Sequence, residues 1–133
     1  MAEAIERQGQ RLLDRVFSAA EQQMAVTSRE RDRFYAARFA AKEACLKALG
    51  TGVTERVRWI DIEILDHVDG VPQLKLSGGG YRRMRRIVGV GNVGHLHLSL
   101  SDDGDYALAF DVLERRRVGE TRARGSKLQL ATK

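Results

Sequence analysis

The sequence contains one cysteine and one proline, and aromatic residues make up only 6% of its 133 positions. A lone cysteine, Cys45, excludes an internal disulfide framework and a cysteine-based metal site, and it favours a reducing environment. No apolar run approaches the roughly 18 residues of a membrane span, and the N-terminus MAEAIERQGQ is too polar for a secretion signal. These absences predict a cytoplasmic protein with no membrane association.

Most of the chain also lacks a net positive charge, although the formal net charge of the whole sequence is +5. Residues 1–113 carry 16 basic and 16 acidic side chains, whereas residues 114–133 carry seven basic and two acidic ones. Hydrophobic residues reach 43%, which is enough for a buried core. We therefore predict one neutral domain over residues 1–113 and a basic, disordered tail over residues 114–133. Nucleic acid is an unlikely partner for such a domain.

The first third of the chain has the apolar spacing of helices. Ala2–Val16 predicts an amphipathic helix that Gly9 weakens or breaks. Ser18 and Glu21 form a capping-box pattern, which predicts the start of a second helix. A third helix is expected over residues 29–49, with Ser28 as its N-cap and Gly50 as its stop signal.

The long third helix has two recognisable faces. Its buried stripe is expected to contain residues at three- and four-residue spacings, namely Phe34, Ala37, Ala41, Cys45 and Ala48. A second face beside it should carry Phe39, Glu43 and Lys47, which are four apart.

Beyond Gly50 the apolar period changes from helical to two. Strands are expected over Val57–Leu65 and Pro72–Ser77, and again over His95–Ser101 and Tyr106–Leu113, so that each pair forms a hairpin. Tyr81–Val88 predicts a short basic helix. Helices followed by antiparallel hairpins indicate an α+β fold.

The segment Gly89–Gly94 matches the pattern G-x-G-x-x-G letter for letter. A dinucleotide-binding fingerprint needs a strand before it and a helix after it, so that the phosphate meets the helix N-terminus. Here the expected order is helix and then strand. The segment therefore predicts a turn.

Two pairs of side chains on strands are candidate metal ligands. His95 and His97 would face the same side, but only serine hydroxyls stand nearby on that face, and these are poor zinc ligands. Ordinary surface histidines are the better interpretation. Asp61 and Glu63 also share a strand face, which suits Mg²⁺. A solvated strand face gives the same pattern, and composition leaves both interpretations open.

Four arginines, Arg82, Arg83, Arg85 and Arg86, form a compact basic cluster. Guanidinium groups at this density can bind phosphate or an acidic protein partner. A solvated basic helix is an equally good interpretation.

The segment Arg38–Gly52, RFAAKEACLKALGTG, offers the strongest constellation of functional groups. A carboxylate, Glu43, stands between cationic side chains on a helix that runs into a glycine-rich turn. Such a set suits a phosphate bridged by a metal ion, because the carboxylate would hold the cation and the cations would neutralise phosphate oxygens. Glu–Lys pairs four apart also occur on ordinary helices, so the chemistry alone is only suggestive.

That segment closely resembles the signature of holo-acyl-carrier-protein synthases, the small bacterial 4′-phosphopantetheinyl transferases. Further matches lie in order along the chain: RLLDRVFSAAE with the family's F-T/S-x-x-E helix region, WIDIEIL and DGVPQLKLSG with its first hairpin, and HLSLSDDGDYALAF with its closing hairpin. The resemblance extends from about Arg7 to Glu114. It implies the fold of these transferases, with N-terminal helices and one long helix packed on an antiparallel sheet of hairpins.

The resemblance also implies an activity. Members of the family transfer 4′-phosphopantetheine from coenzyme A to a serine of apo acyl carrier protein, with Mg²⁺ and release of adenosine 3′,5′-bisphosphate. We accordingly expect a cytoplasmic enzyme of fatty acid biosynthesis. The family is trimeric, with sites shared across subunit boundaries, which implies a homotrimer.

Residue roles follow from the same resemblance. Glu43 matches the family's Mg²⁺ ligand and Lys47 the lysine near the coenzyme A phosphates, so these two are the expected catalytic residues. Expected cofactor-binding residues are Arg38, Lys42, Lys47, Gly50, Thr51, Gly52 and Ser101. Arg11 and Arg15 match helix positions that face the acidic carrier protein.

Two departures from the family pattern bear on activity. Family members open with a strand of the type G-I-G-x-D-I, whose Asp is the other principal Mg²⁺ ligand, whereas this chain begins inside the following helix. Ser101-Asp102 also stands where the family has Ser-His. Asp102, Asp61 and Glu63 are the candidate replacements for the missing Asp, and the sequence does not choose among them.

Three hypotheses follow. The chain is an active transferase, or it is a paralogue that keeps the fold and binds carrier protein or coenzyme A without turnover. The third alternative is a module whose basic residues 114–133 bind RNA, DNA or an acidic surface.

Overall fold

The structure is a computed structural model that describes residues 2–66, 71–103, 106–118 and 126–132, with the backbone alone at positions 2, 5, 101–103, 106–111 and 126–132. Helices occupy most of its first half, and paired strands with one further helix occupy the second. The elements are α1 (Ala2–Gln8), α2 (Gln10–Val16), α3 (Ala19–Val26), α4 (Arg31–Ala48), a short 3₁₀ helix (Trp59–Asp61), β1 (Ile62–Asp66), β2 (Pro72–Leu76), α5 (Gly78–Val88), β3 (Asn92–Asp103), β4 (Tyr106–Arg117) and β5 (Ser126–Thr132).

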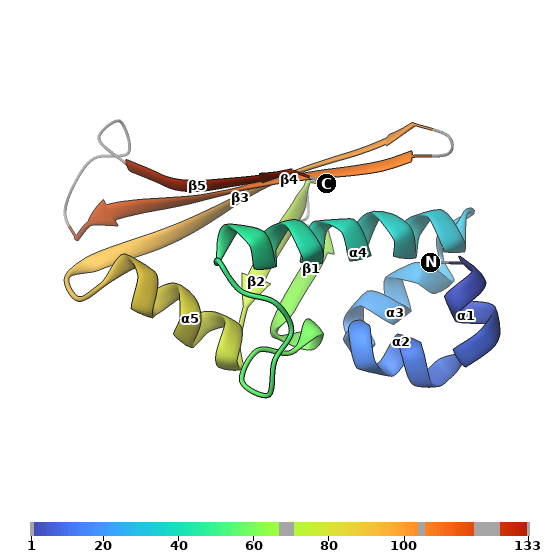
Figure 1. Cartoon of the computed structure of the whole chain (residues 1–133). Coiled ribbons are helices and arrows are strands. Elements are labelled where there is room, and N and C mark those ends of the chain that lie inside the picture. Colours follow the sequence, from blue (N-terminus) through green and yellow to red (C-terminus); the bar gives the residue numbers. More distant parts are fainter. Residues whose placement is uncertain (1, 67–70, 104–105, 119–125, 133) are drawn as a thin grey trace.

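The α4 helix lies at the centre of the molecule (Figure 1). The antiparallel sheet β3-β4-β5 covers one side of it, and the antiparallel hairpin β1-β2 lies against another. The helices α1, α2 and α3 gather near the beginning of α4, and α5 lies near its end. This arrangement confirms the predicted α+β fold with one long helix on a sheet of hairpins. In the described part of the chain, no helix has both the length and the apolarity needed to cross a membrane.

The N-terminal helices follow the sequence signals closely. Gly9 separates α1 from α2 with a φ of 62°, a conformation that glycine adopts without strain. The predicted capping box is confirmed: the Ser18 hydroxyl accepts the Glu21 N–H, and the Glu21 carboxylate accepts the Ser18 N–H. Both bonds satisfy donors that the beginning of α3 would otherwise leave unpaired.

The beginning of α4 differs from the prediction. Glu30 is the N-cap, with no hydrogen bond from its side chain, and the helix starts at Arg31. The expected cap, Ser28, instead donates its backbone N–H to the Ala25 carbonyl, which closes the end of α3. Ser28 as N-cap was therefore wrong, because the short link to α3 uses this residue to finish the preceding helix.

Small side chains let α4 approach the strands closely. Its alanines pack against Ile64 of β1 and against leucines of β2 and β3, and the buried ones are Ala40, Ala41, Ala44 and Ala48. Of the predicted buried stripe, only Phe34 is partly exposed. Because alanine loses no side-chain freedom on burial, this stripe favours both the helix and the close contact.

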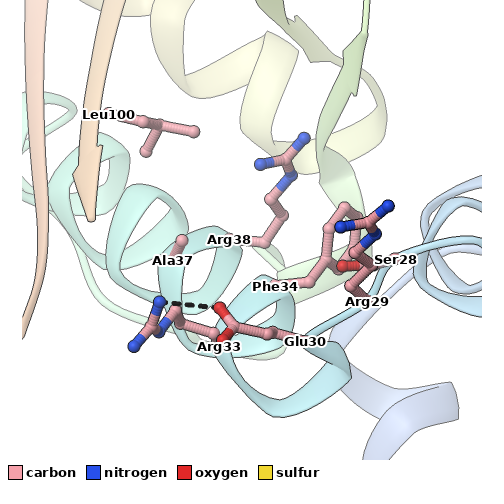
Figure 2. A pocket seen from close by; sticks show the side chains of 8 residues that line it. All are labelled: Ser28, Arg29, Glu30, Arg33, Phe34, Ala37, Arg38 and Leu100. Carbon is pink, nitrogen blue, oxygen red and sulfur yellow. Dashed lines mark hydrogen bonds and ion pairs between the residues drawn. The ribbon is translucent and has the colours of Figure 1, made fainter. Parts of the chain in front are cut away.

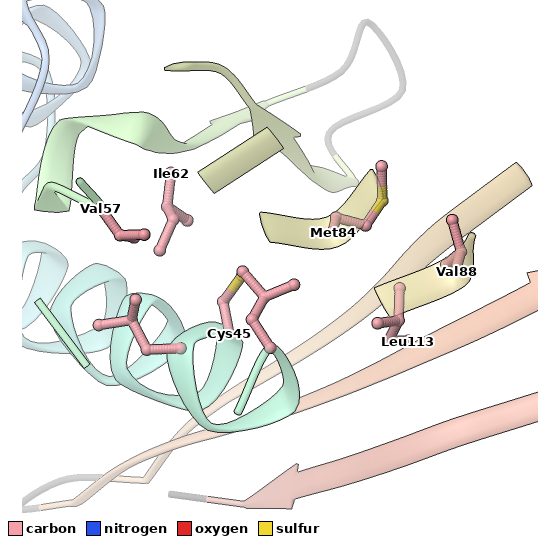
Figure 3. Close-up of a cluster of buried hydrophobic side chains, with 8 residues drawn as sticks. Cys45, Val57, Ile62, Met84, Val88 and Leu113 are labelled. Carbon is pink, nitrogen blue, oxygen red and sulfur yellow. The ribbon is translucent and has the colours of Figure 1, made fainter. Parts of the chain in front are cut away.

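A second cluster joins the C-terminal half of α4 to α5, β1 and β4 (Figure 3). Its buried members are Cys45, Leu46, Leu49, Val57, Ile62, Met84, Val88 and Leu113. Cys45 is fully buried there, which agrees with its position in the apolar stripe. Burial of each larger side chain stabilises the fold by about 1.5–3 kcal/mol, so this cluster fixes α5 onto the end of α4.

The predicted strand over residues 57–65 begins later than expected. Trp59–Asp61 forms one turn of 3₁₀ helix, and β1 starts at Ile62. Asp61 is only 2% exposed, and its carboxylate accepts the backbone N–H groups of Arg58 and Gly80. These bonds pull the chain into a turn that alternation of apolar residues alone does not reveal.

The C-terminal region also differs from the prediction of a disordered tail beginning at residue 114. β4 continues to Arg117, and Ser126–Thr132 pairs with it as β5, with a bulge between Leu113 and Glu114. The alternation in SKLQLAT suits a strand that adds to the open edge of β4. Residues 119–125 and 133 lie outside the described residues.

Candidate functional site

The residues expected to bind the cofactor lie on two different faces of α4. At about 100° per residue, Glu43 and Lys47 are separated by about 40°, whereas Arg38 is about 140° away from Glu43. Glu43 is half-buried and Lys47 is exposed, on a stripe that also includes Ala36 and Phe39. The structure therefore brings Glu43 and Lys47 together and places Arg38 apart from them.

Arg38 lines a cavity of about 430 Å³ beside the first turns of α4 (Figure 2). Two further arginines, Arg29 and Arg33, line the same cavity, together with Ser28, Glu30, Phe34, Ala37 and Leu100. Among the described residues that line it, Glu30 is the one acidic residue, and it forms an ion pair with Arg33 at 2.6 Å. The cavity therefore carries net positive charge. Its volume falls in the range of small-molecule sites.

Arg38 is held in a fixed position at the edge of this cavity. Its side chain is 11% exposed, its Nη2 lies 3.0 Å from Asp66 Oδ1, and its guanidinium stacks 4.3 Å from the Phe34 ring centre. Burial lowers the pKa of Arg38, and the nearby carboxylates of Asp66 and Glu21 oppose that change. Its buried Nε has no hydrogen-bond partner among the described residues.

On the stripe of α4 that contains Glu43 and Lys47, Glu43 supplies the carboxylate that could bind a cation. Within the described part of the chain, no group of three or more His, Cys, Asp or Glu side chains is close enough to form a complete metal site. Mg²⁺ commonly takes only one or two carboxylates and completes its shell with water and substrate phosphates. Glu43 beside Lys47 is thus a suitable partial site for Mg²⁺ in the presence of a phosphate ligand.

The other metal-ligand candidates have structural roles. Asp61 is buried, with backbone N–H donors on its carboxylate and Arg58 3.5 Å away, so the prediction that Asp61 and Glu63 share an open strand face was wrong. His97 Nε2 lies 3.4 Å from Glu114 Oε1 across the strand pair, and His95 is exposed. This agrees with surface histidines.

Lys42 is the clearest correction among the expected cofactor-binding residues. Its Nζ is fully buried, 2.7 Å from Glu21 Oε1, and it also donates to the backbone carbonyls of Val16 and Trp59. Burial lowers the pKa of Lys42, while the Glu21 carboxylate acts in the opposite direction. A phosphate cannot reach Nζ in this arrangement.

Glu21 joins three elements through its two carboxylate oxygens. One oxygen accepts the Ser18 N–H and the Lys42 ammonium, and the other accepts the Ile64 N–H at 3.1 Å. The carboxylate therefore ties the beginning of α3 to the middle of α4 and to β1. The sequence held one clue to this pair, because helical spacing places Lys42 one turn from the buried residues Cys45 and Leu46.

The glycine-rich loop after α4 has a structural reason of its own. Gly50 has a φ of 66°, the Thr51 N–H donates to the Leu46 carbonyl, and the Gly50 N–H donates to the Lys47 carbonyl. This is a Schellman motif, which ends a helix and favours glycine at this position. Gly52 has open space around its Cα, so the loop remains accessible.

The remaining expected residues are placed as follows. Arg11 and Arg15 are both exposed on α2, one turn apart, where a partner can reach them. The backbone of Ser101 and Asp102 lies in β3, but their side chains are outside the described part. The segment Gly89–Gly94 follows α5 and leads into β3, with Gly89 and Gly91 at positive φ, so the prediction of a turn is confirmed.

Comparison with known proteins gives a consistent result. A family model described as the 4′-phosphopantetheinyl transferase superfamily matches residues 1–111. A protein of Xanthobacter autotrophicus named holo-[acyl-carrier-protein] synthase is 46% identical over 113 residues, which cover 85% of this chain and 84% of that protein.

Solved structures agree in fold. The holo-[acyl-carrier-protein] synthase from Neisseria meningitidis superimposes with a TM-score of 0.74 at 29% identity, covering 85% of this chain and 87% of that one. An ACPS–CoA complex from Chronobacterium ammoniagenes gives a TM-score of 0.73 at 33% identity, with coverages of 87% and 89%. The predicted family resemblance is thus confirmed over the helices and both hairpins.

Proposed function

This chain belongs to the 4′-phosphopantetheinyl transferase superfamily, and from that premise we propose that it is a holo-acyl-carrier-protein synthase. It transfers 4′-phosphopantetheine from coenzyme A to a serine hydroxyl of apo acyl carrier protein. The observation that carries the proposal is the match of nearly the whole domain to proteins of that name, one of them 46% identical. A relative solved with coenzyme A supports the donor substrate.

The reaction exchanges one phosphorus–oxygen bond for another. The carrier serine oxygen attacks the pyrophosphate of coenzyme A, and the bond to the leaving adenosine 3′,5′-bisphosphate breaks. Negative charge accumulates on the transferring and leaving phosphates, so positive groups fixed around them provide most of the catalysis.

The basic side chains of α4 supply such groups. Lys47 is exposed beside Glu43, where its ammonium can neutralise a phosphate oxygen. Arg38, with Arg29 and Arg33, makes a separate cationic cavity that suits another phosphate of coenzyme A. The loop at Gly50, Thr51 and Gly52 follows directly after Lys47 and lets a ligand approach the backbone.

Glu43 would hold Mg²⁺, which when bound neutralises charge on the phosphates. Phosphate oxygens and water would supply further ligands, since Mg²⁺ commonly takes only one or two carboxylates. Asp102 is the further candidate ligand from the sequence, and Ser101 stays a predicted cofactor contact.

Arg11 and Arg15 are proposed to receive the carrier protein. Both are exposed on α2, and together they present two positive charges on one helix face. Acyl carrier protein is acidic by the family resemblance, so charge complementarity would steer its approach and orient its serine.

A mass assay tests the proposal directly. Purified chain is incubated with coenzyme A, Mg²⁺ and apo acyl carrier protein, and the carrier is weighed by mass spectrometry. We expect a mass increase equal to one phosphopantetheine. Glu43→Gln should slow the transfer on the order of 10²-fold or more, because it removes the charge that holds the metal.

The matched control is Glu55→Gln, which changes an exposed carboxylate outside α4 and should leave the rate unchanged. Absence of any mass increase, with coenzyme A still bound in calorimetry, would instead identify a non-catalytic paralogue that binds the cofactor. Absence of both would contradict the proposed function altogether.

A further inference from the structure

We propose that a second cavity, formed by α5 and the loop after α4, is a binding site for a phosphate dianion. It is called the α5 cavity here and has a volume of about 310 Å³. Its lining residues are Thr51, Thr54, Arg56, Val57, Gly79, Arg82, Arg83 and Arg86. Arg38, Glu43 and Lys47 do not line it, whereas Thr51, an expected cofactor-binding residue, does. The proposal does not rest on the proposed transferase function, and titration with coenzyme A tests whether the two sites overlap.

One face of α5 forms the wall of this cavity. Gly79, Arg82, Arg83 and Arg86 are spaced by three, four and seven residues, so their side chains lie along a single helix face. The loop over residues 51–57 forms the opposite wall. A Cβ at Gly79 would lie only 1.4 Å from the Arg56 carbonyl oxygen. Glycine is therefore what allows the loop and the helix to meet and enclose the space.

Four arginines line the cavity, and none of the described residues that line it carries a carboxylate. Within the described part of the chain, Arg56, Arg82 and Arg86 form neither an ion pair nor a side-chain hydrogen bond. Other arginines contrast with them: Arg38 and Arg58 each contact an aspartate. The α5 cavity therefore concentrates positive charge that the protein itself leaves uncompensated.

One of the four arginines is held in place by the fold. Arg83 Nε donates to the Leu49 carbonyl at 2.8 Å, and its Nη2 lies 3.4 Å from the Gly50 carbonyl. These acceptors are backbone carbonyls at the end of α4, so no carboxylate neutralises the charge of Arg83 there. Its half-buried guanidinium gives the cavity a rigid cationic base, around which Arg82 and Arg86 can close.

A hydroxyl group adds a neutral donor at the opposite wall. Thr54 Oγ1 accepts the backbone N–H groups of Arg56 and Val57, which fixes its position. Its own proton is then free to donate to an oxygen in the cavity. Planar guanidinium forks with a hydroxyl match the oxygens of a phosphate better than those of a monovalent anion. The volume is large enough for inorganic phosphate or a small phosphate ester.

Inorganic phosphate is the probe for the test. Binding to the full-length chain is measured by isothermal titration calorimetry at fixed ionic strength, with chloride replacing phosphate in the reference. The double variant Arg82→Gln/Arg86→Gln should weaken phosphate binding by tenfold or more. Both residues are exposed, so the variant should keep the wild-type circular dichroism spectrum and unfolding midpoint.

The control is Arg115→Gln, which removes an exposed arginine of β4 from outside the cavity. It should bind phosphate as the wild type does. An equal loss in the control would show that phosphate senses only the overall charge, which would overturn the proposal.

A competition experiment with coenzyme A tests whether the α5 cavity binds free phosphate or a phosphate group of coenzyme A. The titration is repeated with saturating coenzyme A, and we expect phosphate binding to persist and the double variant to bind coenzyme A with unchanged affinity. If coenzyme A displaces the phosphate, or loses affinity in the double variant, the α5 cavity belongs to the substrate site and the second site does not exist. Failure of the transferase proposal would appear separately, in the mass assay.

Discussion

The buried pair of Glu21 and Lys42 is the residue-scale feature that most changes the interpretation of the sequence. Both side chains are fully buried, and each of their polar atoms is used by another element. A lysine inside a phosphate-binding motif thus serves the fold, because three acceptors surround its ammonium. Arg38 and Lys47 stay the cations of α4 that we propose for phosphate binding.

Lys42→Met should destabilise the protein by about 3–5 kcal/mol, because it leaves the Glu21 carboxylate buried without its cation. Urea denaturation measures this. The double variant Glu21→Gln/Lys42→Met should be more stable than the single one, since the uncompensated charge is gone. If Lys42→Met instead kept wild-type stability and lost only coenzyme A affinity, the ion pair would not be structural and Lys42 would return to the binding site.

At the scale of elements, the contact between α5 and the preceding loop depends on glycine. The helix α5 begins with three glycines, Gly78, Gly79 and Gly80, which lie close to Asp61 and Arg56. Asp61 accepts the Gly80 N–H, which caps the start of the helix, and Gly79 gives the loop its close approach. The sequence predicted this helix only from Tyr81, whereas α5 begins at Gly78, because these glycines let a helix start against the backbone of the preceding loop.

Gly79→Ala should therefore disturb the packing of α5. The added Cβ meets the Arg56 carbonyl, a backbone atom that cannot rotate away, so we expect a loss of about 1–3 kcal/mol or more. Gly52→Ala is the matched control, because it has open space at its Cα, and it should change the stability little. Thermal unfolding of the two variants side by side gives the comparison. Equal stability would mean that the loop moves away from α5 at no cost.

For the molecule as a whole, the separation of Arg38 from Glu43 around α4 bears on assembly. A single protomer presents these two groups on faces about 140° apart. A homotrimer with sites between subunits, which the family resemblance implies, would let Arg38 of one protomer and Glu43 of the next meet at the same coenzyme A. Cyclic symmetry then repeats that site at each interface.

Complementation between variants tests this arrangement. Light scattering should give about three times the chain mass of 14.9 kDa. Arg38→Ala and Glu43→Gln should each lose transferase activity, whereas their co-expression should restore about one quarter of it, the fraction of intact sites under random mixing in a closed ring. The separately purified variants are the baseline. Co-expressed trimers without restored activity would place both residues in a site within one protomer.

Prediction from the sequence succeeded where the signal was local. The capping box at Ser18 and Glu21, the break at Gly9 and the stop at Gly50 each depend on residues within a few positions. It failed at Ser28 and at Asp61, where the decisive hydrogen bonds involve the end of a neighbouring helix or a residue 19 positions away. Roles at Ser101 and Asp102 stay predictions.

The sequence by itself determined the order of helices and hairpins, the apolar side of α4 and membership of the family, because periodicity and motifs are carried by neighbouring residues. Only the tertiary structure decided which charges remain available. Glu21 and Lys42 are 21 positions apart and neutralise each other in the core, whereas arginines of α5 meet Arg56 with no carboxylate between them. Partners that lie far apart along the sequence cannot be recognised from the sequence alone, because their contact depends on how the elements pack.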